Sequence, residues 1–539
     1  MHIAPFSASS RPGSPRATTS CARRWMACGQ ALLLAAGVLA AAPHVHAQTT
    51  GELTTIRSFN GPTGQAPTEA LTLGNDGIFY GVTSTGGLNG QGTVFRVTTD
   101  GAITVLHNFD STTDGLRPRG KLLLASDGNF YGVTQSSGPA GGGTVYRIST
   151  GGSFSVVHAF TTSGAQGKTP LAGLIQGADG ALYGTTQAGD IEGDGMGDGT
   201  LYQLTLTGSF AVLHFFDFET SGVGGYAPNT SLVQGSDGNF YGVTREGGDN
   251  GAGTVYRLGA DGSFTNLYSF KGTTDGSTPL GPLVEGNNGV FYGLTTEGGG
   301  SNRGTFFSIT GSGTLTTVRT LITGDPLLTS QTTGLTKSGD GTFYLTAASG
   351  TSGTGAILQF TTTGVITTVY PFIAPASNTI VGRLPVAPLT QAQDGSFYGT
   401  TSSGGASGYG TVYHLVVYPY PPFFIGQVDL DNGVKYLSFP NGNFFGFYSF
   451  LSDPHYIYHD DLGYEYVFDA RDGQGGVYLY DFKSSDFFYT SQTFPFPYLY
   501  DFNLAAVLYY YPDRSRPGRY SGPTTRYFYN FRTSQIISK

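Results

Sequence analysis

An acidic loop offers the clearest set of possible metal ligands in this chain. Segment 189–199 alternates glycine with acidic residues at Asp190, Glu192, Asp194 and Asp198. A hard cation such as Ca²⁺ binds oxygen ligands spaced in this way along a glycine-containing loop. The twelfth position, however, is Leu201, where an EF-hand loop carries a bidentate Glu. The segment is therefore either a calcium site or an acidic turn without a bound ion.

Seven charged residues form a second candidate group, because they fall in Gly-, Ser-, Thr- and Asp-rich segments that we expect to be loops. Loops on a rigid scaffold are the usual location of binding residues. A rim of arginines and carboxylates suits a polar ligand, and the alternative is an ordinary solvated face. These rim residues are Arg117, Arg119, Arg245, Glu246, Asp249, Glu297 and Arg303.

The sequence identifies no catalytic residue. His107, His158 and His214 share one position of a repeated segment, which indicates an architectural role. The serine-hydrolase motif G-x-S-x-G does not occur. Both cysteines, Cys21 and Cys28, precede an expected cleavage site. The mature chain would therefore lack a disulfide, a thiol nucleophile and a cysteine metal site.

These residues must be positioned by a tandem repeat. A turn followed by Phe-Tyr, or by Leu182-Tyr183 in the third copy, recurs seven times, at tyrosine intervals of 51, 52, 58, 51, 52 and 54 residues. A fixed period of this size indicates one supersecondary unit copied in tandem. The tyrosines are Tyr80, Tyr131, Tyr183, Tyr241, Tyr292, Tyr344 and Tyr398.

Each copy contains four strand-like runs. In the second copy they cover 121–125, 129–134, 144–149 and 154–160. Asp127-Gly128 separates the first two runs, and this dipeptide predicts a tight type I′ hairpin because Gly tolerates positive φ. Four short antiparallel strands per copy are typical of a β-propeller blade.

The ends of the repeat region predict a closed seven-bladed ring. Segment 54–59 matches the fourth strand of later copies but precedes the first copy, and the last copy stops at its third strand, 411–416. The N-terminal strand can thus complete the last blade, which leaves no long exposed sheet edge. An open solenoid is the alternative, but it does not explain the spare and the missing strand.

The repeated Phe-Tyr-Gly phrase indicates packing rather than ligand binding. In an alternating strand Phe and Gly point to one face and Tyr to the other, so both faces can pack against neighbouring blades. Gly would then admit close approach of the next blade.

The repeat elements D-G-x-F-Y-G-[VT]-T, G-x-G-T-[VL]-[FY]-[RQ]-[ILV] and T-x-[LV]-[HY]-x-F resemble the GloVer-type tandem repeat of bacterial exported proteins, over about residues 54–417. The sixth copy departs from the pattern, with Leu345 for Gly and Ala356-Ile357 for Thr-Val. The resemblance implies a propeller on exported or surface-anchored proteins and no settled activity. A more distant similarity to streptogramin-lyase-type propellers keeps an enzyme among the alternatives.

Residues 1–47 are typical of a secretory signal peptide. Four arginines precede the apolar run 31–42, and Val45-His46-Ala47 suits cleavage after Ala47. The apolar run is too short to span a bilayer, and no second one follows. The net charge of −9 argues against nucleic-acid and anionic-membrane partners, which need basic patches. We expect a secreted, periplasmic or cell-surface protein.

After residue 417 the composition changes. The proline-rich segment 419–422 marks a boundary, and alternating aromatic runs such as 477–482 predict a small antiparallel β-domain over 418–539. Its aromatic rings either fill a core poor in Leu and Ile or bind a ligand. The preceding propeller domain would cover 48–417.

We therefore expect an all-β, exported, non-enzymatic propeller that binds an extracellular ligand or surface component, with carbohydrate as one candidate ligand and calcium as the one candidate cofactor. We expect it to be a monomer. The alternatives are a lyase or glycan-active hydrolase that uses rim carboxylates or histidines, and a structural component of a surface or matrix.

Overall fold

The computed structural model describes most of the chain from residue 50 to residue 418. The gaps are 164–165, 190–197, 217–223, 288, 323–324, 326–333, 340, 349–353 and 373–381. Beyond residue 418 it describes the strands between 428 and 538 and residues 532–533. The expected signal peptide lies outside the described residues.

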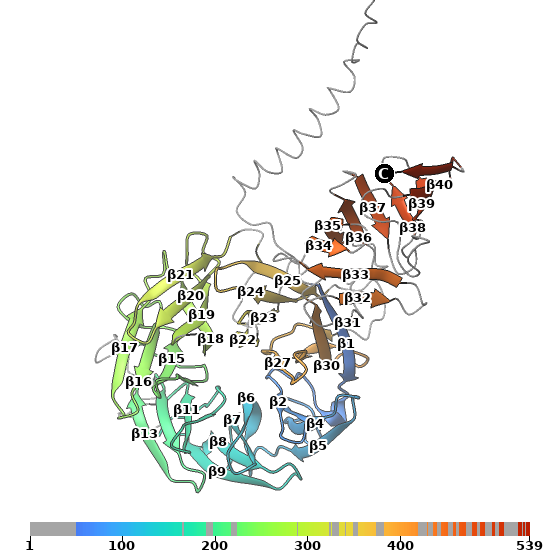
Figure 1. Cartoon of the computed structure of the whole chain (residues 1–539). Helices are drawn as coiled ribbons and strands as arrows, with labels where there is room; N and C mark the ends of the chain where they lie inside the picture. Colours follow the sequence, from blue (N-terminus) through green and yellow to red (C-terminus); the bar gives the residue numbers. More distant parts are fainter. Residues whose placement is uncertain are drawn as a thin grey trace, which may run out of the picture. The chain divides into compact units, whose positions relative to one another are not determined.

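Seven four-stranded antiparallel sheets form the blades of a β-propeller, as the repeat predicts (Figure 1). The first three blades are β2 (Thr72–Leu73), β3 (Phe79–Thr83), β4 (Thr93–Val97) and β5 (Ile103–Asn108); β6 (Leu116–Leu124), β7 (Phe130–Ser136), β8 (Gly141–Ile148) and β9 (Phe154–Thr161); and β10 (Ile175–Gln176), β11 (Leu182–Thr186), β12 (Thr200–Leu204) and β13 (Phe210–Phe215). The next three are β14 (Val233–Gln234), β15 (Phe240–Thr244), β16 (Thr254–Leu258) and β17 (Phe264–Ser269); β18 (Ser277–Glu285), β19 (Val290–Glu297), β20 (Thr305–Thr310) and β21 (Leu315–Thr320); and β22 (Thr336–Lys337), β23 (Phe343–Ala347), β24 (Ala356–Phe360) and β25 (Ile366–Pro371).

The seventh blade joins the two ends of the repeat region. Its strand order is β27 (Thr390–Gln391), β28 (Phe397–Thr401), β30 (Thr411–Tyr418) and β1 (Thr50–Ser58). β1 pairs antiparallel with β30, from Thr50 opposite Tyr418 to Ser58 opposite Thr411. The N-terminal strand is therefore the fourth strand of the last blade, and the predicted closure is confirmed. The remaining short elements are η1 (Gly61–Thr63), β26 (Gly382–Arg383) and β29 (Ser403–Gly404).

The Asp-Gly turn differs from the type I′ hairpin that the dipeptide predicts. In the second blade the Ala125 N–H donates to the Asn129 carbonyl at 2.9 Å, which closes a three-residue loop. Gly128 has a φ of 78°, whereas Asp127 is not among the residues with positive φ. A type I′ turn needs positive φ at both central residues, so the prediction was wrong. Aspartate recurs here because its carboxylate accepts the Asn129 N–H at 3.0 Å and the Tyr131 hydroxyl at 2.9 Å.

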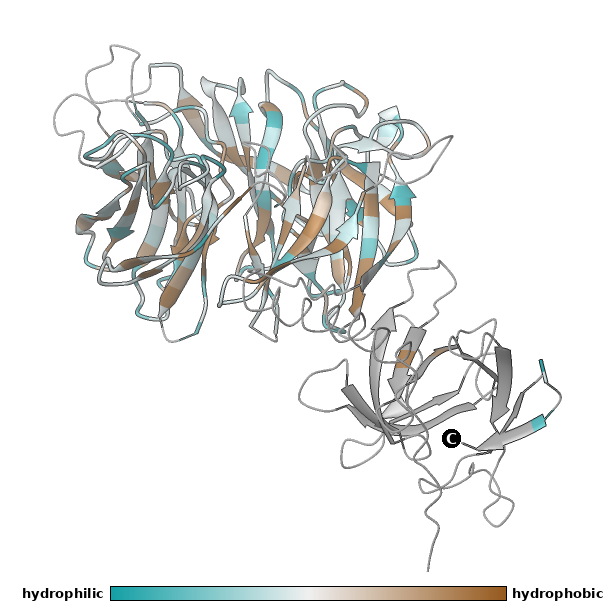
Figure 2. Cartoon of the chain, turned by 90° about the horizontal axis from the view of Figure 1, so that it is seen from above, coloured by the Kyte–Doolittle hydropathy of each residue, from teal (hydrophilic) through white to brown (hydrophobic). Residues whose placement is uncertain are grey.

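The aromatic pair of the repeat packs between blades, as expected. The Tyr80 ring in the first blade lies 4.1 Å from the Phe130 ring in the second, centroid to centroid. The same contact joins Tyr183 to Phe240 at 4.2 Å. Each buried hydrophobic cluster of the propeller combines residues of two neighbouring blades. Figure 2 shows the most hydrophobic residues within the strands of the blades.

The glycine of the phrase has a different neighbour from the one expected. A Cβ built on Gly132 would lie 2.4 Å from the Tyr146 hydroxyl oxygen, and Tyr146 is the cross-strand partner of Gly132 in the same blade. The glycine therefore accommodates a large ring of the third strand of its own blade, and not the next blade. This correction follows from the register of β7 and β8.

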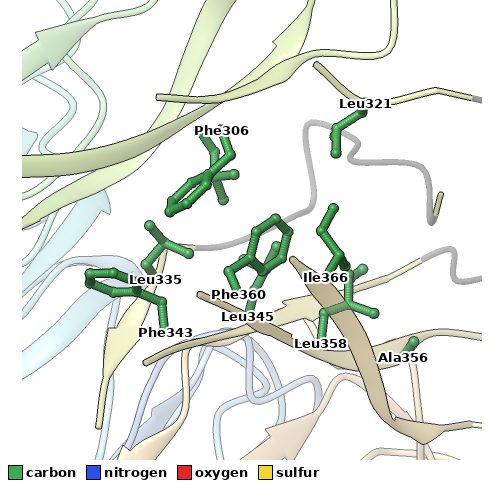
Figure 3. Packing of buried hydrophobic residues seen from close by; sticks show 11 residues of the cluster. Phe306, Leu321, Leu335, Phe343, Leu345, Ala356, Leu358, Phe360 and Ile366 are labelled. Atoms are coloured by element: carbon green, nitrogen blue, oxygen red, sulfur yellow. The ribbon is translucent and has the colours of Figure 1, made fainter. Parts of the chain in front are cut away.

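The sixth blade departs from the repeat by coupled changes. Leu345 replaces the glycine, and its cross-strand partner is Leu358 in place of a ring. Ala347 faces Ala356, where six other blades have a hydrogen-bonded threonine pair such as Thr134 and Thr144. Both leucines and both alanines are buried, in a cluster shared with Phe306 of the fifth blade (Figure 3). Each pair changes as a unit, so packing is kept.

The C-terminal segment forms one antiparallel sheet in which each strand pairs with the next in sequence. Leu479 and Phe488 are cross-strand partners, and both are buried. These two side chains, one of them aromatic, are packed within this part of the chain. The strands are β31 (Val428–Asp429), β32 (Lys435–Ser438), β33 (Phe444–Phe450), β34 (Tyr456–His459), β35 (Gly463–Asp469), β36 (Val477–Asp481), β37 (Asp486–Thr490), β38 (Tyr498–Asp501), β39 (Ala506–Tyr510), β40 (Tyr527–Asn530) and β41 (Gln535–Ser538).

Candidate functional site

The first strands of the blades, with the residues just before them, surround a central cavity of about 1080 Å³. Neighbouring first strands are tied together there; for example, the Thr336 hydroxyl donates to the Leu389 carbonyl at 2.8 Å across two blades. Thr72 makes the same kind of bond to the Leu122 carbonyl. The cavity wall is therefore built from backbone that the whole ring holds in place.

One position of the repeat supplies a complete ring of residues around this cavity. It lies directly before the leucine that recurs in every first strand, and we call its seven members the inner ring. The strands approach closely here: a Cβ on the adjacent Gly120 would lie 2.2 Å from the Gly173 backbone nitrogen. Small side chains and prolines therefore occupy six of the seven places. The inner ring is Ala70, Lys121, Gly173, Ser231, Pro282, Gly334 and Pro388, and all seven line the cavity.

Lys121 is the exception in the inner ring. Its side chain is exposed, and it lines the cavity, so its accessible surface faces the cavity. The ammonium group lies deep in the ring, and this desolvation lowers its pKa even though part of the Lys121 side chain stays accessible within the cavity. Among the described residues no hydrogen bond or ion pair to this ammonium is found. Lys121 therefore brings a cation without a partner into the cavity.

Glu69 and Arg119 stand beside it, at the start of the first two blades. An Arg119 guanidinium nitrogen (Nη1) lies 3.8 Å from Glu69 Oε1, and Arg119 Nε donates to Gln135 Oε1 at 3.3 Å. Burial is the largest influence on Glu69 and raises its pKa to about 7. The Arg119 charge, the Gly120 N–H and the Thr68 hydroxyl act in the opposite direction. The carboxyl group can therefore hold a proton at a pH where an ordinary glutamate has lost it.

The fourth ionisable residue in the lining, Lys337, is already engaged. Its ammonium donates to the Gly286 carbonyl at 2.9 Å and to the Asn287 side-chain oxygen at 3.3 Å. These partners lie in the hairpin turn of the preceding blade. Lys337 thus ties two blades together, whereas Lys121 does not.

The structure separates the rim residues that the sequence groups together. Only Arg119 of the seven lines the cavity. Arg245 pairs with its neighbour Glu246 at 3.8 Å, and both are about half exposed. Arg303 donates to the Asp325 carbonyl at 3.1 Å. Arg117, Asp249 and Glu297 are exposed.

The proposed calcium ligands Asp190, Glu192 and Asp194 lie outside the described residues. Asp198 is described, and its backbone carbonyl accepts the Ala227 N–H at 2.8 Å. Within the described ranges no group of three His, Cys, Asp or Glu residues is arranged to hold a metal ion. None of the helices in the part of the chain that the structure describes is long and apolar enough to cross a membrane.

The repeated histidines pack between blades, as their shared position indicates. The His158 ring stacks on Phe210 at 4.0 Å, and the His214 ring stacks on Phe264 at 3.6 Å. Burial lowers the pKa of both imidazoles to about 4. They are neutral at physiological pH and belong to the outer part of the blades.

Sequence reasoning missed Glu69 and Lys121, although the repeat contains a signal for both. Aligning the copies on the recurring leucine shows Lys121 where the other six have small residues or proline. Glu69 stands one place earlier, where most copies have Gly, Ala or Thr. A charge at a position that is otherwise small is not explained by the packing that the other six copies share.

Comparison with known proteins identifies the repeat. The family model described as the Gloeobacter/Verrucomicrobia repeat matches residues 45–222 and 191–413. No curated protein matches.

Three similar solved structures come from different bacteria. A catalytically inactive virginiamycin B lyase from Staphylococcus aureus, solved with quinupristin, is 17% identical, with 68% of this chain and 100% of that chain covered and a TM-score of 0.45. An extracellular domain from B. thetaiotaomicron is 10% identical, with 91% and 58% covered and a TM-score of 0.45. A lectin from Burkholderia pseudomallei is 12% identical, with 66% and 96% covered and a TM-score of 0.45.

Proposed function

The chain belongs to the Gloeobacter/Verrucomicrobia repeat family, and from this premise we propose that it is an exported, non-enzymatic propeller that binds a small extracellular ligand in its central cavity. The cavity carries this proposal. Its volume of about 1080 Å³ lies just above the range of small-molecule sites, which is about 300–1,000 Å³. Its wall combines aliphatic residues with a few convergent polar groups, which is the usual composition of such a site.

The wall is also suitably rigid. The first strands are joined to one another by hydrogen bonds across blades, and buried clusters fill each interface behind them. A pre-formed site of this kind loses little conformational entropy when a ligand binds. Carbohydrate remains one candidate ligand.

A second candidate function, a lyase or glycan-active hydrolase, is favoured by one observation. The pKa of Glu69 is raised to about 7, which suits a residue that gives and takes a proton near neutral pH. In such an enzyme Glu69→Gln would abolish turnover but leave ligand binding in place. If the protein only binds, the same variant has no turnover to lose.

The same proposal includes export and roles for the segments and loops outside the central cavity. We propose that residues 1–47 are a signal peptide, that 48–417 form the binding propeller, and that 418–539 assist attachment to a surface. We further propose that the loop with Asp190, Glu192, Asp194 and Asp198 binds calcium, and that the exposed rim residues contact the ligand or partner as it enters. Mass spectrometry of the exported protein tests the cleavage, and calcium titration of the loop tests the ion.

Blocking the cavity tests the central claim. Ser231 belongs to the inner ring, so Ser231→Trp should fill the cavity from the fourth blade. Ser153→Trp, at an exposed position in a hairpin loop, is the matched control. The chain without its first 47 residues is screened on a glycan array and against small metabolites by thermal shift.

Binding that Ser231→Trp removes and Ser153→Trp retains supports the cavity as the site. Binding that survives in both variants moves the site elsewhere on the chain. A wild-type chain that binds nothing in either screen contradicts the binding function.

A further inference from the structure

We propose that the cavity ligand is an organic anion whose carboxylate binds Lys121 and Arg119. This inference rests on the proposed binding function and adds the chemical class of the ligand. It starts from the charges that line the cavity.

The sign of the charge in the cavity is opposite to that of the protein. The whole chain has 36 acidic and 27 basic side chains and a net charge of −9. The described lining contains three cations, Arg119, Lys121 and Lys337, but a single carboxylate, Glu69. Low-dielectric walls concentrate this local field, so anions are attracted into a channel that the protein's overall charge would repel.

Lys121 provides the binding site with an unused charge. An ammonium group that is removed from bulk water is unfavourable unless it is paired, and its pKa falls as a result. The pKa of Lys121 is lowered for this reason. Its three N–H donors have no acceptor among the described residues, so a carboxylate that enters the cavity supplies both the missing charge and the missing acceptors.

Arg119 can contribute without losing its present contacts. Guanidinium has five N–H donors; the one on Nε binds Gln135, and the nitrogen Nη1 lies 3.8 Å from a Glu69 carboxylate oxygen. That separation is long for a hydrogen bond. Donors therefore remain for a ligand carboxylate, which Arg binds well because the two planar groups match.

Glu69 need not repel such a ligand. With its pKa raised to about 7, the carboxyl group can hold a proton and donate a hydrogen bond to the incoming anion. Binding of an anion beside it favours this protonated form. Two cations and one protonated acid then face the ligand together.

The rest of the wall limits what the anion can be. Leu171, Leu280, Pro282, Val386 and Pro388 line the same cavity. These apolar surfaces favour an organic anion with an apolar face over a fully hydrated inorganic ion. Acidic sugars and non-sugar carboxylic acids share this chemistry, and the test distinguishes them.

The test uses the chain without its first 47 residues and four probes in isothermal titration. Trigalacturonate and benzoate carry carboxylates on a sugar and on a non-sugar body, galactotriose is the neutral match, and sodium sulfate is the inorganic match. Lys121→Met keeps the length of the side chain and removes its charge. Lys271→Met, at an exposed position, is the control.

We expect one or both carboxylates to bind more tightly than galactotriose and sulfate, and the stronger of the two identifies the source of the anion. Lys121→Met should weaken that binding roughly ten-fold to hundred-fold, as is typical when a charged hydrogen bond is lost, and Lys271→Met should not. Added salt should weaken it as well. Circular dichroism of both variants checks that they are folded.

Two results overturn the inference: equal affinity for the charged and neutral probes, or equal affinity of Lys121→Met and wild type for the carboxylate. The variant Ser231→Trp distinguishes a failure of the anion proposal from a failure of the proposed binding function. If that variant removes binding of a neutral ligand, the cavity is a binding site and only the proposal of an anionic ligand is wrong. If no ligand binds in the cavity, both proposals fail.

Discussion

The ring of Tyr398 in the seventh blade lies 4.1 Å from the ring of Phe79 in the first, centroid to centroid. The same separation joins Tyr80 to Phe130 between the first two blades. The junction that closes the ring is thus packed like the others. Closure therefore depends on two features together, the aromatic contact near the centre and the pairing of β1 with β30.

Removing the closing ring should destabilise the propeller strongly. Phe79 is fully buried, and truncation of a buried phenylalanine costs about 3–5 kcal/mol through lost burial and the cavity left behind. We expect Phe79→Ala to lower the free energy of unfolding by this amount in urea titrations. Leu88→Ala, at a side chain that is 80% exposed, is the control and should change it little. A loss below about 1 kcal/mol for Phe79→Ala would show that the closing contact is not needed.

The leucine pair of the sixth blade suggests that a destabilising glycine substitution in the second blade can be rescued by a second substitution. Gly132→Leu alone should clash with the Tyr146 ring, since even a Cβ there would lie 2.4 Å from its hydroxyl oxygen. Adding Tyr146→Leu recreates the Leu345–Leu358 pair of the sixth blade and should restore much of the lost thermal stability. Gly300→Ala is the steric control, because no atom lies within 4 Å of its Cβ position. A double variant as unstable as Gly132→Leu would contradict the coupling.

The buried threonine pairs should also behave as units. The Thr134 hydroxyl lies 2.8 Å from the Thr144 hydroxyl and accepts the Thr144 N–H at 3.1 Å. Thr134→Ala leaves the buried Thr144 N–H without its acceptor, which costs about 1–3 kcal/mol, whereas the Thr144 hydroxyl still donates to the Asp114 carbonyl at 2.7 Å. The variant with alanine at both positions matches the sixth blade and should cost less than the sum of the single changes. A double-mutant cycle in urea measures this, and strict additivity would disprove it.

Much of the fold could be predicted from the sequence because the information is local and repeated. Seven copies of the aromatic phrase give the number of blades, and the spare strand before Tyr80 gives the closure. The turn type was wrong because Asp-Gly suits two loop geometries, and the choice depends on Tyr131, whose hydroxyl binds the aspartate. The neighbour of Gly132 was wrong because the register of a third strand decides it.

The candidate site was harder to predict because it depends on how close each residue lies to the centre of the propeller. The sequence places Arg117 and Arg119 in one variable segment, and regular alternation would put both on the same face of a strand. Arg117 has a positive φ of 56°, which interrupts this alternation, so Arg119 lines the cavity and Arg117 does not. Lys121 lies within a strand, and strands were read as packing elements. Only the ring of seven equivalent positions shows that this residue faces an open centre.

Glu69 should make stability depend on pH. In the folded protein its pKa is about 7, against an ordinary value of 4.5. Between these values the folded state holds a proton that the unfolded state has lost, so stability falls as pH rises through this window. The loss is complete above pH 7 and amounts to at most about 3 kcal/mol.

Glu69→Gln isolates this effect from that of the histidines. The lowered pKa values of His158 and His214 act in the opposite direction, since they reduce stability as pH falls from 6.5 towards 4. Urea unfolding of the variant and of wild type from pH 4 to pH 8 gives the difference due to Glu69 alone. The free energy of unfolding of Glu69→Gln minus that of wild type should increase as the pH rises to 7. Asp249→Asn, an exposed carboxylate, is the control, and equal profiles for Glu69→Gln and wild type would refute the prediction.

Lys121 should titrate below the ordinary range of lysines, and an anion should reverse the shift. Burial without a partner disfavours the ammonium form, whereas a bound carboxylate favours it. Reductive methylation with ¹³C-formaldehyde places an NMR probe on each lysine, and the signal absent from Lys121→Met identifies this residue. The midpoint should lie below the ordinary lysine value of 10.5 and should rise when a carboxylate that binds the cavity is added. Its neutral counterpart should leave the midpoint unchanged. A midpoint at 10.5 in the free protein would mean that Lys121 is hydrated by bulk water rather than held in the cavity.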